Sequence, residues 1–492
     1  AGCAVCMPAP PPPPLHPNSF GQNPFLSSSG WYVNPKLRDN LLKTAAAEET
    51  TADERAVLRK MMEVPSAYWI DEKAKIRGKD SLETLEGILN DAGARPKPPL
   101  CVFVFYDLPN RDCNAAASAG EIRFDDESAA TALRQYKEEY VNPFVEVLAE
   151  HEHVPVVLIL EPDSLGNVIS NEGSNGCSAA TINNYKDGLR YAVMQLSQKT
   201  PHVGLYIDAA HGGWMGFEHN AASFVKLMKE MKIIHLIRGF STNVANYQPL
   251  GLDDMCPEEA FAKTGREFGG ATWGLAEWCK AEGEGSACCK ADPCKLLPLG
   301  SGGATELDYV QTLRKHFIIE TGWAPYFVID TGRNGALNDG RSACQSWCNV
   351  RGAGAGAAAT VNTGLEAVDA YFWLKTPGES DGCTATLPSG ETCARFDPTC
   401  ANVDAIGSQS GEPRAPEAGD WFAYQARLLA RHANLRLDQP GALDAAFGVG
   451  SWREQQRILP AQWTPPPPIS MRPSPRPPPP PSPQPPLPPP VP

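Results

Sequence analysis

Short apolar runs that end in polar residues recur through the middle of the chain, and an amphipathic segment usually follows each run. Near-continuous apolar runs are typical of parallel strands buried on both faces, because helices cover both sides of such a sheet. The runs are residues 67–71, 102–107, 156–163, 203–211, 236–243, 327–334 and 370–381. The clearest helical partners are 131–151, 181–199 and 308–320. This alternation, with few hairpin signals, predicts an α/β fold with a parallel sheet, most simply a barrel.

The polar ends of these runs indicate where a site would lie. In parallel α/β folds the site forms at the carboxyl ends of the strands, where these polar residues gather. Any one strand-end acid is explained equally well as a loop residue, a helix cap or an ion-pair partner. All seven runs end in polar residues, and a separate structural role for each acid does not explain this shared pattern.

Proline is the most unusual residue of the composition, with 48 copies among 492 residues, most of the excess lying at the two ends. Such runs adopt polyproline II and act as stiff spacers or wall tethers. The sequence therefore predicts a Cys- and Pro-rich linker over 1–16, one globular domain over 17–460 and a proline-rich tail over 461–492. The chain starts at Ala1 without methionine, so we expect a mature form or a fragment.

Charge and cysteine content narrow the class of protein. A net charge of −14 argues against nucleic acid or an anionic membrane surface as the partner, and no apolar run is long enough to span a bilayer. The 15 cysteines lack the paired spacing of a zinc site, so an oxidising compartment is expected: secreted, extracellular or cell wall. Local disulfides are predicted among Cys279, Cys288, Cys289 and Cys294, with Cys256 as a further partner. The odd count leaves at least one thiol unpaired within the chain, or paired outside it.

Two acid-bearing stretches follow the second and third predicted strands. In YDLPNRDC, Arg111 and Asp112 precede Cys113. They form either a surface ion pair beside a structural cysteine, or a carboxylate that the guanidinium holds ionised or sharing a proton. In VVLILEPD, Glu161 and Asp163 fall on the same side of the chain if it stays extended beyond the strand.

A third acid-bearing stretch, LKTPGESDGC over 374–383, carries Lys375, Glu379 and Asp381, for which a solvated charge run is the alternative. Without a metal motif or a phosphate loop, three acidic strand ends indicate general acid–base hydrolysis. Glycoside cleavage needs two carboxyl roles, one of them an acid whose pKa is raised. Sugars also need flat apolar platforms. The aromatic residues at or near strand ends are Trp69, Tyr106, Trp214 and Trp347.

An ordered series of motifs spans nearly the whole central region. It comprises GQNPF, VPSAYWID, YDLPNRDC, LEPDSLGN, DAAHGGWMG, TNVANY, IDTGRNG, WCNVRGAG, NTG and LKTPGESDG. This series resembles glycoside hydrolase family 6, the cellobiohydrolases and endoglucanases that cut β-1,4-glucan with inversion. The resemblance implies a distorted barrel of seven parallel strands, with no cofactor and no metal. Proline-tailed members that resemble this chain occur in green algae, and such an origin is one expectation.

Site roles follow from the resemblance, position by position. Asp163 would be the general acid, and Asp112 the carboxylate that raises the pKa of Asp163 and stabilises an oxocarbenium-like transition state. Asp381 matches the family's proposed base, with a proton relay through water near Ser118 and Asp112 as the alternative. Tyr106 would crowd and distort the sugar ring. Matching substrate-binding positions are Trp69, Asp71, Ser118, His211, Trp214, Asn246, Trp347, Lys375 and Glu379, and Glu161 would support the acid.

The resemblance also implies two disulfides, Cys113–Cys177 and Cys348–Cys400, each beside the site. Cys383 and Cys393 are a candidate for a third.

The chain departs from the family pattern at three places. Asn114 replaces a small residue, and Gln248-Pro249 stands where some relatives carry an aromatic that contacts a distal sugar. The insert over 276–295 matches nothing in the family.

The long segment between Asp381 and Trp421 favours a covered, cellobiohydrolase-like cleft over an open one. An endo-acting glucanase is the alternative. A non-catalytic wall protein that binds glucan is a second alternative, but such a protein would not need to keep Asp112, Asp163 and Asp381 together. The expected partner is a β-1,4-glucan polysaccharide. We expect a monomer, with any carbohydrate-binding modules lying outside this chain.

Overall fold

Seven parallel strands form the centre of the computed structural model, which describes residues 21–437 except 28, 175, 252–300, 302, 337–338 and 344. The strands are β1 (Tyr68–Ile70), β2 (Cys101–Phe105), β3 (Val156–Leu160), β4 (Val203–Asp208), β5 (Gly239–Thr242), β6 (Tyr326–Asp330) and β7 (Val368–Phe372). They lie side by side in chain order, and every neighbouring pair is parallel. The predicted parallel α/β sheet is confirmed, because each predicted run overlaps one strand.

Both faces of the sheet are buried, which is why the strands read as continuous apolar runs. Every residue of β2 and β3 is buried. Side chains alternate along a strand, so Phe103 and Phe105 join the core under the outer helices, whereas Val102 and Val104 join the core on the inner face. The inner core also contains Trp373, which is completely buried.

The sheet curls towards a barrel that is joined only loosely between its first and last strands. A single bridge links Ser66 to Trp373 there, and the N–H of Ala67 donates to the carbonyl of Trp373 at 2.9 Å. Just beyond it, the indole nitrogen of Trp69 donates to the carbonyl of Leu374 at 2.8 Å. The expected distorted seven-stranded barrel is therefore present, with a seam between β1 and β7.

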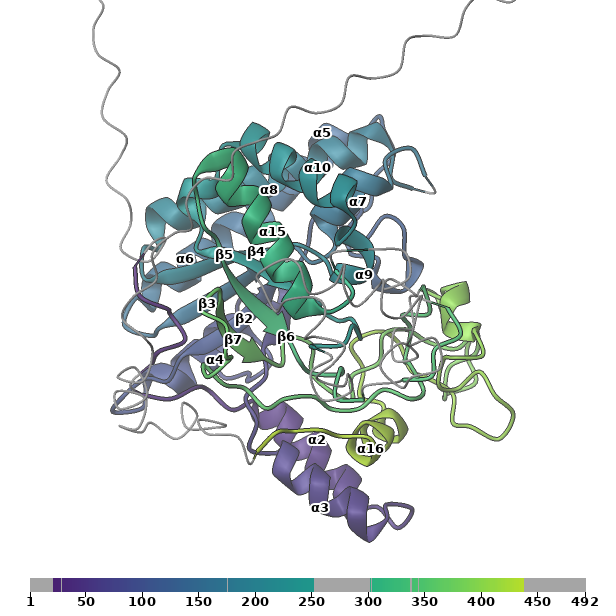
Figure 1. Ribbon diagram of the computed structural model, residues 1–492. Coiled ribbons are helices and arrows are strands. Elements are labelled where there is room, and N and C mark those ends of the chain that lie inside the picture. The colour runs from purple at the N-terminus through teal and green to yellow at the C-terminus, as the bar shows by residue number, and fades with distance from the viewer. Residues whose placement is uncertain are drawn as a thin grey trace, which may run out of the picture. The chain divides into compact units, whose positions relative to one another are not determined.

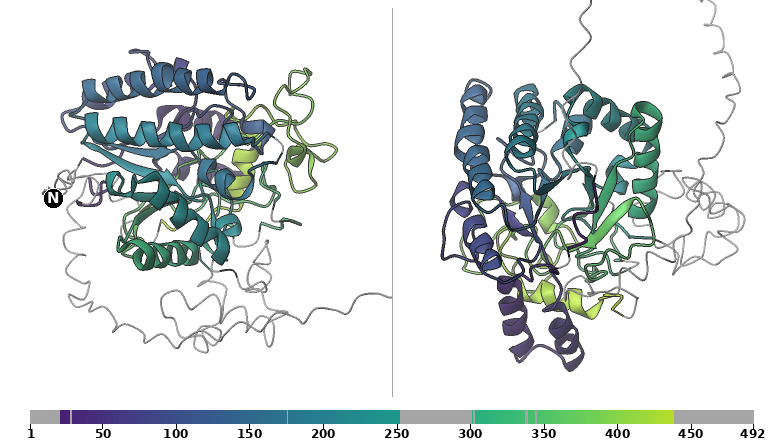
Figure 2. Two further views of the ribbon diagram at one scale, coloured as in Figure 1. Left: turned by 90° about the horizontal axis from the view of Figure 1, so that it is seen from above. Right: turned by 90° about the vertical axis from the view of Figure 1, so that its left-hand side faces the viewer.

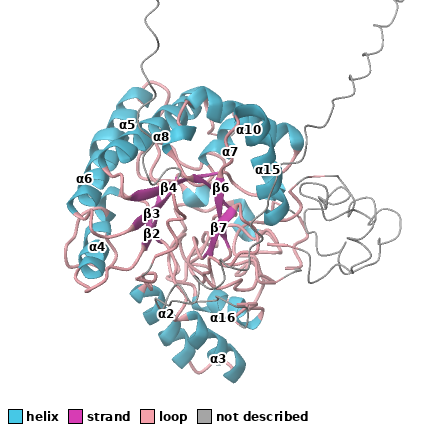
Figure 3. Ribbon diagram, turned by 60° about the vertical axis from the view of Figure 1, so that its left-hand side comes forward, coloured by secondary structure: helices cyan, strands magenta, loops and turns pink. Residues whose placement is uncertain are grey.

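Helices that follow the strands form an arc over the outer face of the sheet (Figures 1 and 3). They are α4 (Leu85–Gly93), α5 (Ala129–Gln135), α6 (Asn142–Glu150), α7 (Ser164–Ser170), α8 (Ala179–Lys199), α9 (Gly212–Met215), α10 (Glu218–Met231) and α15 (Glu306–Thr321). The helix predicted over 131–151 changes its hydrogen bonding at a π-helical turn, η3 (Tyr136–Val141), just before Pro143. Proline has no N–H to continue the α-helical pattern. Short 3₁₀ turns are η1 (Lys73–Lys75), η2 (Ala116–Ser118), η4 (Ile234–Leu236) and η5 (Pro398–Ala401).

Three further helices, α2 (Pro35–Ala46), α3 (Ala52–Met61) and α16 (Ala423–Arg431), pack together on the other side of the strands (Figures 1 and 2). Glu54 of α3 is buried and pairs with Arg431 of α16 at 2.6 Å. An N-terminal helix, α3, and the last described helix, α16, are therefore joined. No helix in the described ranges has the length and apolarity that crossing a membrane requires. The proline-rich ends, the insert over 276–295 with Cys279, Cys288, Cys289 and Cys294, and also Cys256 lie outside the described residues.

Candidate active site

A cleft of about 490 Å³ lies at the carboxyl ends of the strands and contains every catalytic and substrate-binding residue that the sequence predicts. These residues lie in or after all seven strands and are separated by up to several hundred positions in the chain. The predicted residues that line the cleft are Trp69, Asp71, Tyr106, Asp112, Ser118, Asp163, His211, Trp214, Asn246, Trp347, Lys375, Glu379 and Asp381.

The two acids after β3 point to different places because the backbone turns sharply between them. Glu161 has a φ of 51° and Asp163 a φ of 63°, both in the left-handed region, so the chain does not stay extended as assumed from the sequence. Asp163 lines the cleft, whereas Glu161 is completely buried. The carboxylate of Glu161 accepts from the hydroxyl of Tyr136 at 2.7 Å and from the N–H of Asp107 and Leu108, each at 3.3 Å.

Asp163 sits among groups that favour its protonated form. Burial raises the pKa of Asp163 well above its usual value, and the nearby carboxylates of Asp112 and Asp208 raise it further. The backbone N–H of Asp163 donates to Asp208 Oδ2 at 2.9 Å, which fixes the turn. At moderate pH, Asp163 therefore keeps a proton that it can donate within the cleft.

Asp112 is the acidic neighbour of Asp163 and also has a left-handed backbone, with φ of 49°. Burial raises its pKa to about 6, against hydrogen bonds from Ser118 and Asn167 that lower it. The amide nitrogen of Asn167 lies 3.5 Å from Asp112 Oδ1. The two acids titrate as a pair, because a charge on one disfavours a charge on the other.

Arg111 does not form the direct ion pair with Asp112 that was one alternative from the sequence. Its guanidinium donates to the carbonyls of Asp71, Tyr106 and Ser118, and lies 3.5 Å from Asp107 Oδ1. It also stacks over the ring of Tyr106, 4.5 Å from the centroid. Arg111 therefore holds the loops after β1 and β2 together and acts on Asp112 only through its charge.

Tyr106 forms an aromatic corner with Trp69, their ring centroids 5.4 Å apart in an edge-on arrangement. Burial raises the pKa of Tyr106 well above its usual value, so the phenol remains neutral and can donate a hydrogen bond. Such a corner can contact a sugar ring from two directions.

Asp381 is almost fully engaged by its neighbours. Oδ1 pairs with Arg333 at 2.5 Å. Oδ2 accepts from the hydroxyl of Tyr247 at 2.5 Å and from the N–H of Asn349 at 2.8 Å. Both carboxylate oxygens of Asp381 therefore already accept from protein donors.

Charged pairs flank Trp69 at the seam. Lys75 pairs with Asp71 at 2.5 Å, and Lys375 pairs with Glu379 at 3.5 Å. The ammonium of Lys375 lies 5.3 Å from the ring centroid of Trp69. These groups offer both donors and acceptors to hydroxyls beside an aromatic face.

Other binding positions follow β4 and β5. Burial lowers the pKa of His211 to about 3, with the charge of Arg341 acting in the same direction, so this imidazole is neutral. Trp214 is held by a hydrogen bond from its indole nitrogen to Ser170 Oγ at 2.8 Å. Asn246 accepts from the N–H of Tyr247 at 2.9 Å.

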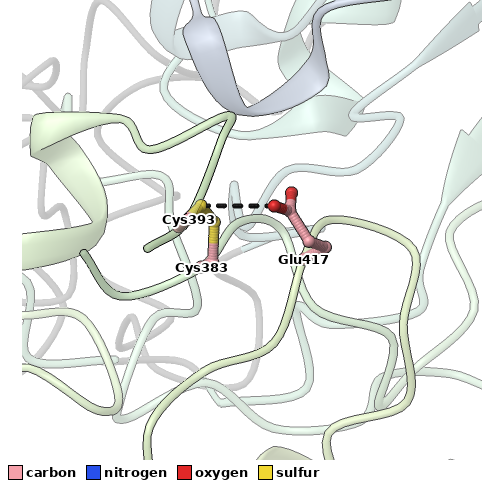
Figure 4. Close-up of side chains that lie close together, drawn as sticks. All are labelled: Cys383, Cys393 and Glu417. Atoms are coloured by element: carbon pink, nitrogen blue, oxygen red, sulfur yellow. Dashed lines mark hydrogen bonds between the residues drawn. A yellow bond between two sulfur atoms is a disulfide. The ribbon is translucent and has the colours of Figure 1, made fainter. Parts of the chain in front are cut away.

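Disulfides brace the loops that border the cleft. The structure contains Cys113–Cys177 and Cys348–Cys400, the pairs that the resemblance implies, and also Cys383–Cys393. Figure 4 shows the third beside Glu417, whose carboxylate lies 3.5 Å from Cys393 Sγ.

Cys383, Cys393 and Glu417 are also the one group in the described part of the chain whose side chains have metal-ligand spacing. A thiolate is the form of cysteine that binds metal, and here the two sulfurs are bonded to each other. This group therefore acts as a brace for the loop that carries Arg395 and not as a metal site.

Several functional neighbours were missed from the sequence. Asp208 and Asp330 end predicted strands, so the signal that singled out Asp163 was also present for them. Asp330 Oδ2 accepts from the N–H of Ala245 at 3.0 Å and of Lys375 at 2.9 Å, which joins the loops after β5 and β7. Arg333 and Tyr247 lie within motifs of the family series, but nothing local indicates that both reach Asp381.

The sequence profile of Glycosyl hydrolases family 6 matches residues 26–285 and 288–433. The chain belongs to this family.

Named relatives agree with membership of family 6. The 1,4-β-D-glucan cellobiohydrolase C of Emericella nidulans is 33% identical over 413 residues, covering 83% of this chain and 75% of that protein. Exoglucanase-6A of Humicola insolens is 33% identical over 424 residues, covering 85% of this chain and 76% of that one.

Solved structures of family 6 enzymes have the same fold. The catalytic core domain of the cellobiohydrolase Cel6A from Chaetomium thermophilum matches with a TM-score of 0.64 and 31% identity, covering 84% of this chain and 99% of that one. Cellobiohydrolase II of Humicola insolens, in complex with glucose and cellotetraose, matches with a TM-score of 0.63 and 31% identity, covering 84% of this chain and 99% of that one.

Proposed function

We propose that the protein hydrolyses β-1,4-glucosidic bonds of cellulose or a related β-glucan, with inversion, using Asp163 as general acid. The observation that carries the proposal is the pairing of Asp163 with Asp112 in the cleft, where burial and the second carboxylate raise the pKa of the acid. The relatives named as glucan cellobiohydrolases, and the solved complex with cellotetraose, support this substrate class.

In the first step, Asp163 donates its proton to the glycosidic oxygen as the bond from that oxygen to the anomeric carbon breaks. Water attacks the opposite face of the anomeric carbon and loses one proton, so the new hydroxyl has inverted configuration. The carboxylate of Asp112 stabilises the positive charge that develops on the ring. Tyr106 crowds the ring and holds it in a distorted shape that approaches the transition state.

The proton from water goes to Asp112 through bound water beside Ser118. The pair then holds one proton before and after the reaction, and its transfer from Asp112 to Asp163 restores the starting state. Asp381, the other acceptor expected from the resemblance, is tied to Arg333, Tyr247 and Asn349. In this proposal Asp381 holds the loops around the cleft in place, and Asp381→Asn lowers the rate less than Asp112→Asn does.

Substrate is held by the aromatic and charged residues of the cleft. Trp69, Trp214 and Trp347 provide flat faces for sugar rings, whose axial C–H bonds are apolar. Lys375, Glu379 and Asp71 bind hydroxyls, and the neutral His211 and Asn246 add further polar contacts. Glu161 acts indirectly, since it fixes the loop that follows β2.

A cellobiohydrolase-like mode of action follows from the segment after Asp381. Arg395, Ala418 and Gly419 of this segment line the cleft, and the Cys383–Cys393 disulfide stiffens it. A covered cleft retains one chain and releases cellobiose. The endo-acting alternative predicts a rapid fall in the viscosity of a soluble glucan.

We extend the proposal to the setting of the protein. The disulfides beside the cleft suit a secreted, extracellular or wall-bound monomer, because such bonds persist in oxidising compartments. The catalytic domain would span 17–460, with the linker over 1–16 and the tail over 461–492 acting as spacers.

The test is the Asp163→Asn variant, with Asp187→Asn on the exposed face of α8 as matched control. We expect release of reducing sugar from a soluble cellulosic substrate to fall at least about 10³-fold in the first variant and to stay unchanged in the control. Binding of cellotetraose should survive in both. Proton NMR of the first products should show the α-anomer. Full turnover by Asp163→Asn, or an early β-anomer, contradicts the mechanism, and binding without hydrolysis by the unaltered protein supports the wall-protein alternative.

A further inference from the structure

Lys36 and Glu83 lie in the cleft although the proposed mechanism uses neither. Both line it together with Asn34. Their charged groups, Lys36 Nζ and Glu83 Oε1, are 2.9 Å apart, and the side chains are 47% and 59% exposed. Lys36 belongs to α2, and Glu83 lies in the loop that follows β1, so the pair joins two separate parts of the fold.

The pair lies at the seam end of the cleft, beside the last binding residues of the proposed site. Burial raises the pKa of Glu379, and the charges of Lys375, Lys36 and Lys75 partly oppose that rise. Trp421 fixes α2 at this place, because its indole nitrogen donates to Thr44 Oγ1 at 3.0 Å. The backbone of Trp421 also pairs with that of Glu379 in an antiparallel bridge. The helix that carries Lys36 is therefore attached to the segment that pairs with Glu379, and both residues line the same cleft.

The groups at this end match the hydroxyls of a neutral sugar. An ammonium offers three donors and a carboxylate offers two acceptor oxygens, while each sugar hydroxyl both donates and accepts. Asn34 uses Oδ1 to cap α2, accepting from the N–H of Leu37 at 3.1 Å, and the cap does not involve its amide nitrogen. Each lysine here already has a carboxylate partner, so the position carries no surplus charge that would favour an acidic sugar.

The cost of engaging Lys36 and Glu83 in binding is small. An exposed ion pair contributes little to stability, because water solvates both groups well when they separate. A ligand can therefore exchange this contact for its own hydrogen bonds with little loss. A buried pair such as Arg333–Asp381 could not be exchanged in this way.

We propose that Asn34, Lys36 and Glu83 bind one further glucose unit of the glucan chain, beyond the unit held by Trp69, Lys375 and Glu379. This inference rests on the proposed function. It extends the cleft past the seam between β1 and β7, on the side away from Trp214. The position selects for chain length, since only oligosaccharides that reach past Glu379 gain its contacts.

The test compares Lys36→Met and Glu83→Gln with Lys43→Met in the full chain. Methionine keeps the apolar stem of lysine but removes the ammonium. Lys43 is a matched control because it lies on the same helix in an exposed pair with Asp39, away from the residues that line the cleft. The measurement is kcat/KM on cello-oligosaccharides from cellotriose to cellohexaose, with thermal unfolding of each variant alongside.

We expect Lys36→Met and Glu83→Gln to lower kcat/KM for cellohexaose about fivefold while cellotriose is unaffected, a difference that fits the loss of a typical hydrogen bond. Lys43→Met should change neither substrate. If a variant lowers kcat/KM by the same factor at every chain length, the further glucose position is overturned, but the proposed function is not. Failure of the unaltered protein to hydrolyse any of these oligosaccharides would overturn the proposed function, and the further position with it.

Discussion

The acids of the site depend on backbone conformations that residues other than glycine rarely adopt. Asp112, Glu161 and Asp163 all have positive φ, between 49° and 63°. Such positions cost about 1–3 kcal/mol each and persist only where the surroundings hold them. Here the fixed partners of Glu161 hold the turn, and as a result Glu161 faces the core while Asp163 faces the cleft. The strain is used to separate a supporting acid from a reacting one.

Asp208→Asn should move the alkaline limb of the pH profile of kcat/KM to lower pH. Burial raises the pKa of Asp208 to about 7, so above that pH its charge helps Asp163 to retain a proton. Without that charge, Asp163 loses its proton at lower pH. Asparagine can keep an acceptor for the N–H of Asp163 and Ala210, and its amide can face Ser241.

The measurement for Asp208→Asn is kcat/KM across pH, with Asp187→Asn as control. The rate below the alkaline limb should be nearly unchanged, because the turn is preserved. An alkaline limb that does not move would show that Asp208 has no electrostatic influence on Asp163.

The ends of the helices and the ends of the strands have different structural roles. Strand-end acids such as Asp330 join neighbouring loops around the cleft. The helices that lie apart from the cleft are stabilised by their own caps. Thr51 and Glu54 form a capping box at the start of α3, and Glu54 also pairs with Arg431 of α16. The cap therefore supports both the helix and its attachment to α16.

Thr51→Ala should lower the free energy of unfolding by about 1 kcal/mol, because the N–H of Glu54 loses its side-chain acceptor. Thr51→Ser keeps the hydroxyl and should restore most of that stability. Activity should be unchanged in both, since Thr51 does not line the cleft. Denaturant unfolding measures the stability of both variants, and kcat/KM measures their activity. If Thr51→Ala and Thr51→Ser lose the same free energy of unfolding, the methyl group of Thr51, and not the cap, contributes the stability.

The whole molecule buries an unusual number of acids around its catalytic end. Burial raises the pKa of Asp107 to about 9 and that of Glu306 to about 8, and those of Glu161 and Asp208 to about 7. In the unfolded chain these carboxyls lose their protons near pH 4. Between those values the folded state binds more protons than the unfolded one, so stability falls as pH rises. Maximum stability is therefore expected on the acid side of neutrality.

Asp107→Asn should flatten that dependence. Asp107 Oδ2 is buried and has no hydrogen-bond donor among the described residues, which suits a protonated carboxyl or an amide. The amide does not titrate, so the variant avoids the loss of stability that the native chain suffers as pH approaches about 9. Thermal unfolding from pH 5 to pH 9 should show the variant gaining on the native protein at the alkaline end, whereas Asp187→Asn follows the native curve. If the stability of Asp107→Asn and that of the native protein change in parallel from pH 5 to pH 9, the prediction is contradicted.

Much of the fold could be predicted because parallel strands leave a local signature. A strand buried on both faces must be apolar along its whole length, and its polar continuation marks the end that faces a site. The π-helical turn before Pro143, the seam between β1 and β7, and the attachment of α16 to α3 were not predicted. Each depends on contacts between segments far apart in the chain, for which neighbouring residues carry no signal.

Local periodicity in the sequence was sufficient to predict the class of fold, and the resemblance to family 6 supplied the residues expected in the cleft. Which acid faces solvent and which faces the core depended on long-range contacts, because a left-handed turn is stable only where distant partners hold it. The engagement of Asp381 by Arg333 and Tyr247, and the presence of Lys36 in the same cleft as Glu379, likewise arise from segments that meet only when the barrel closes. Proton affinity follows burial and neighbouring charge, and both are properties of the packed molecule.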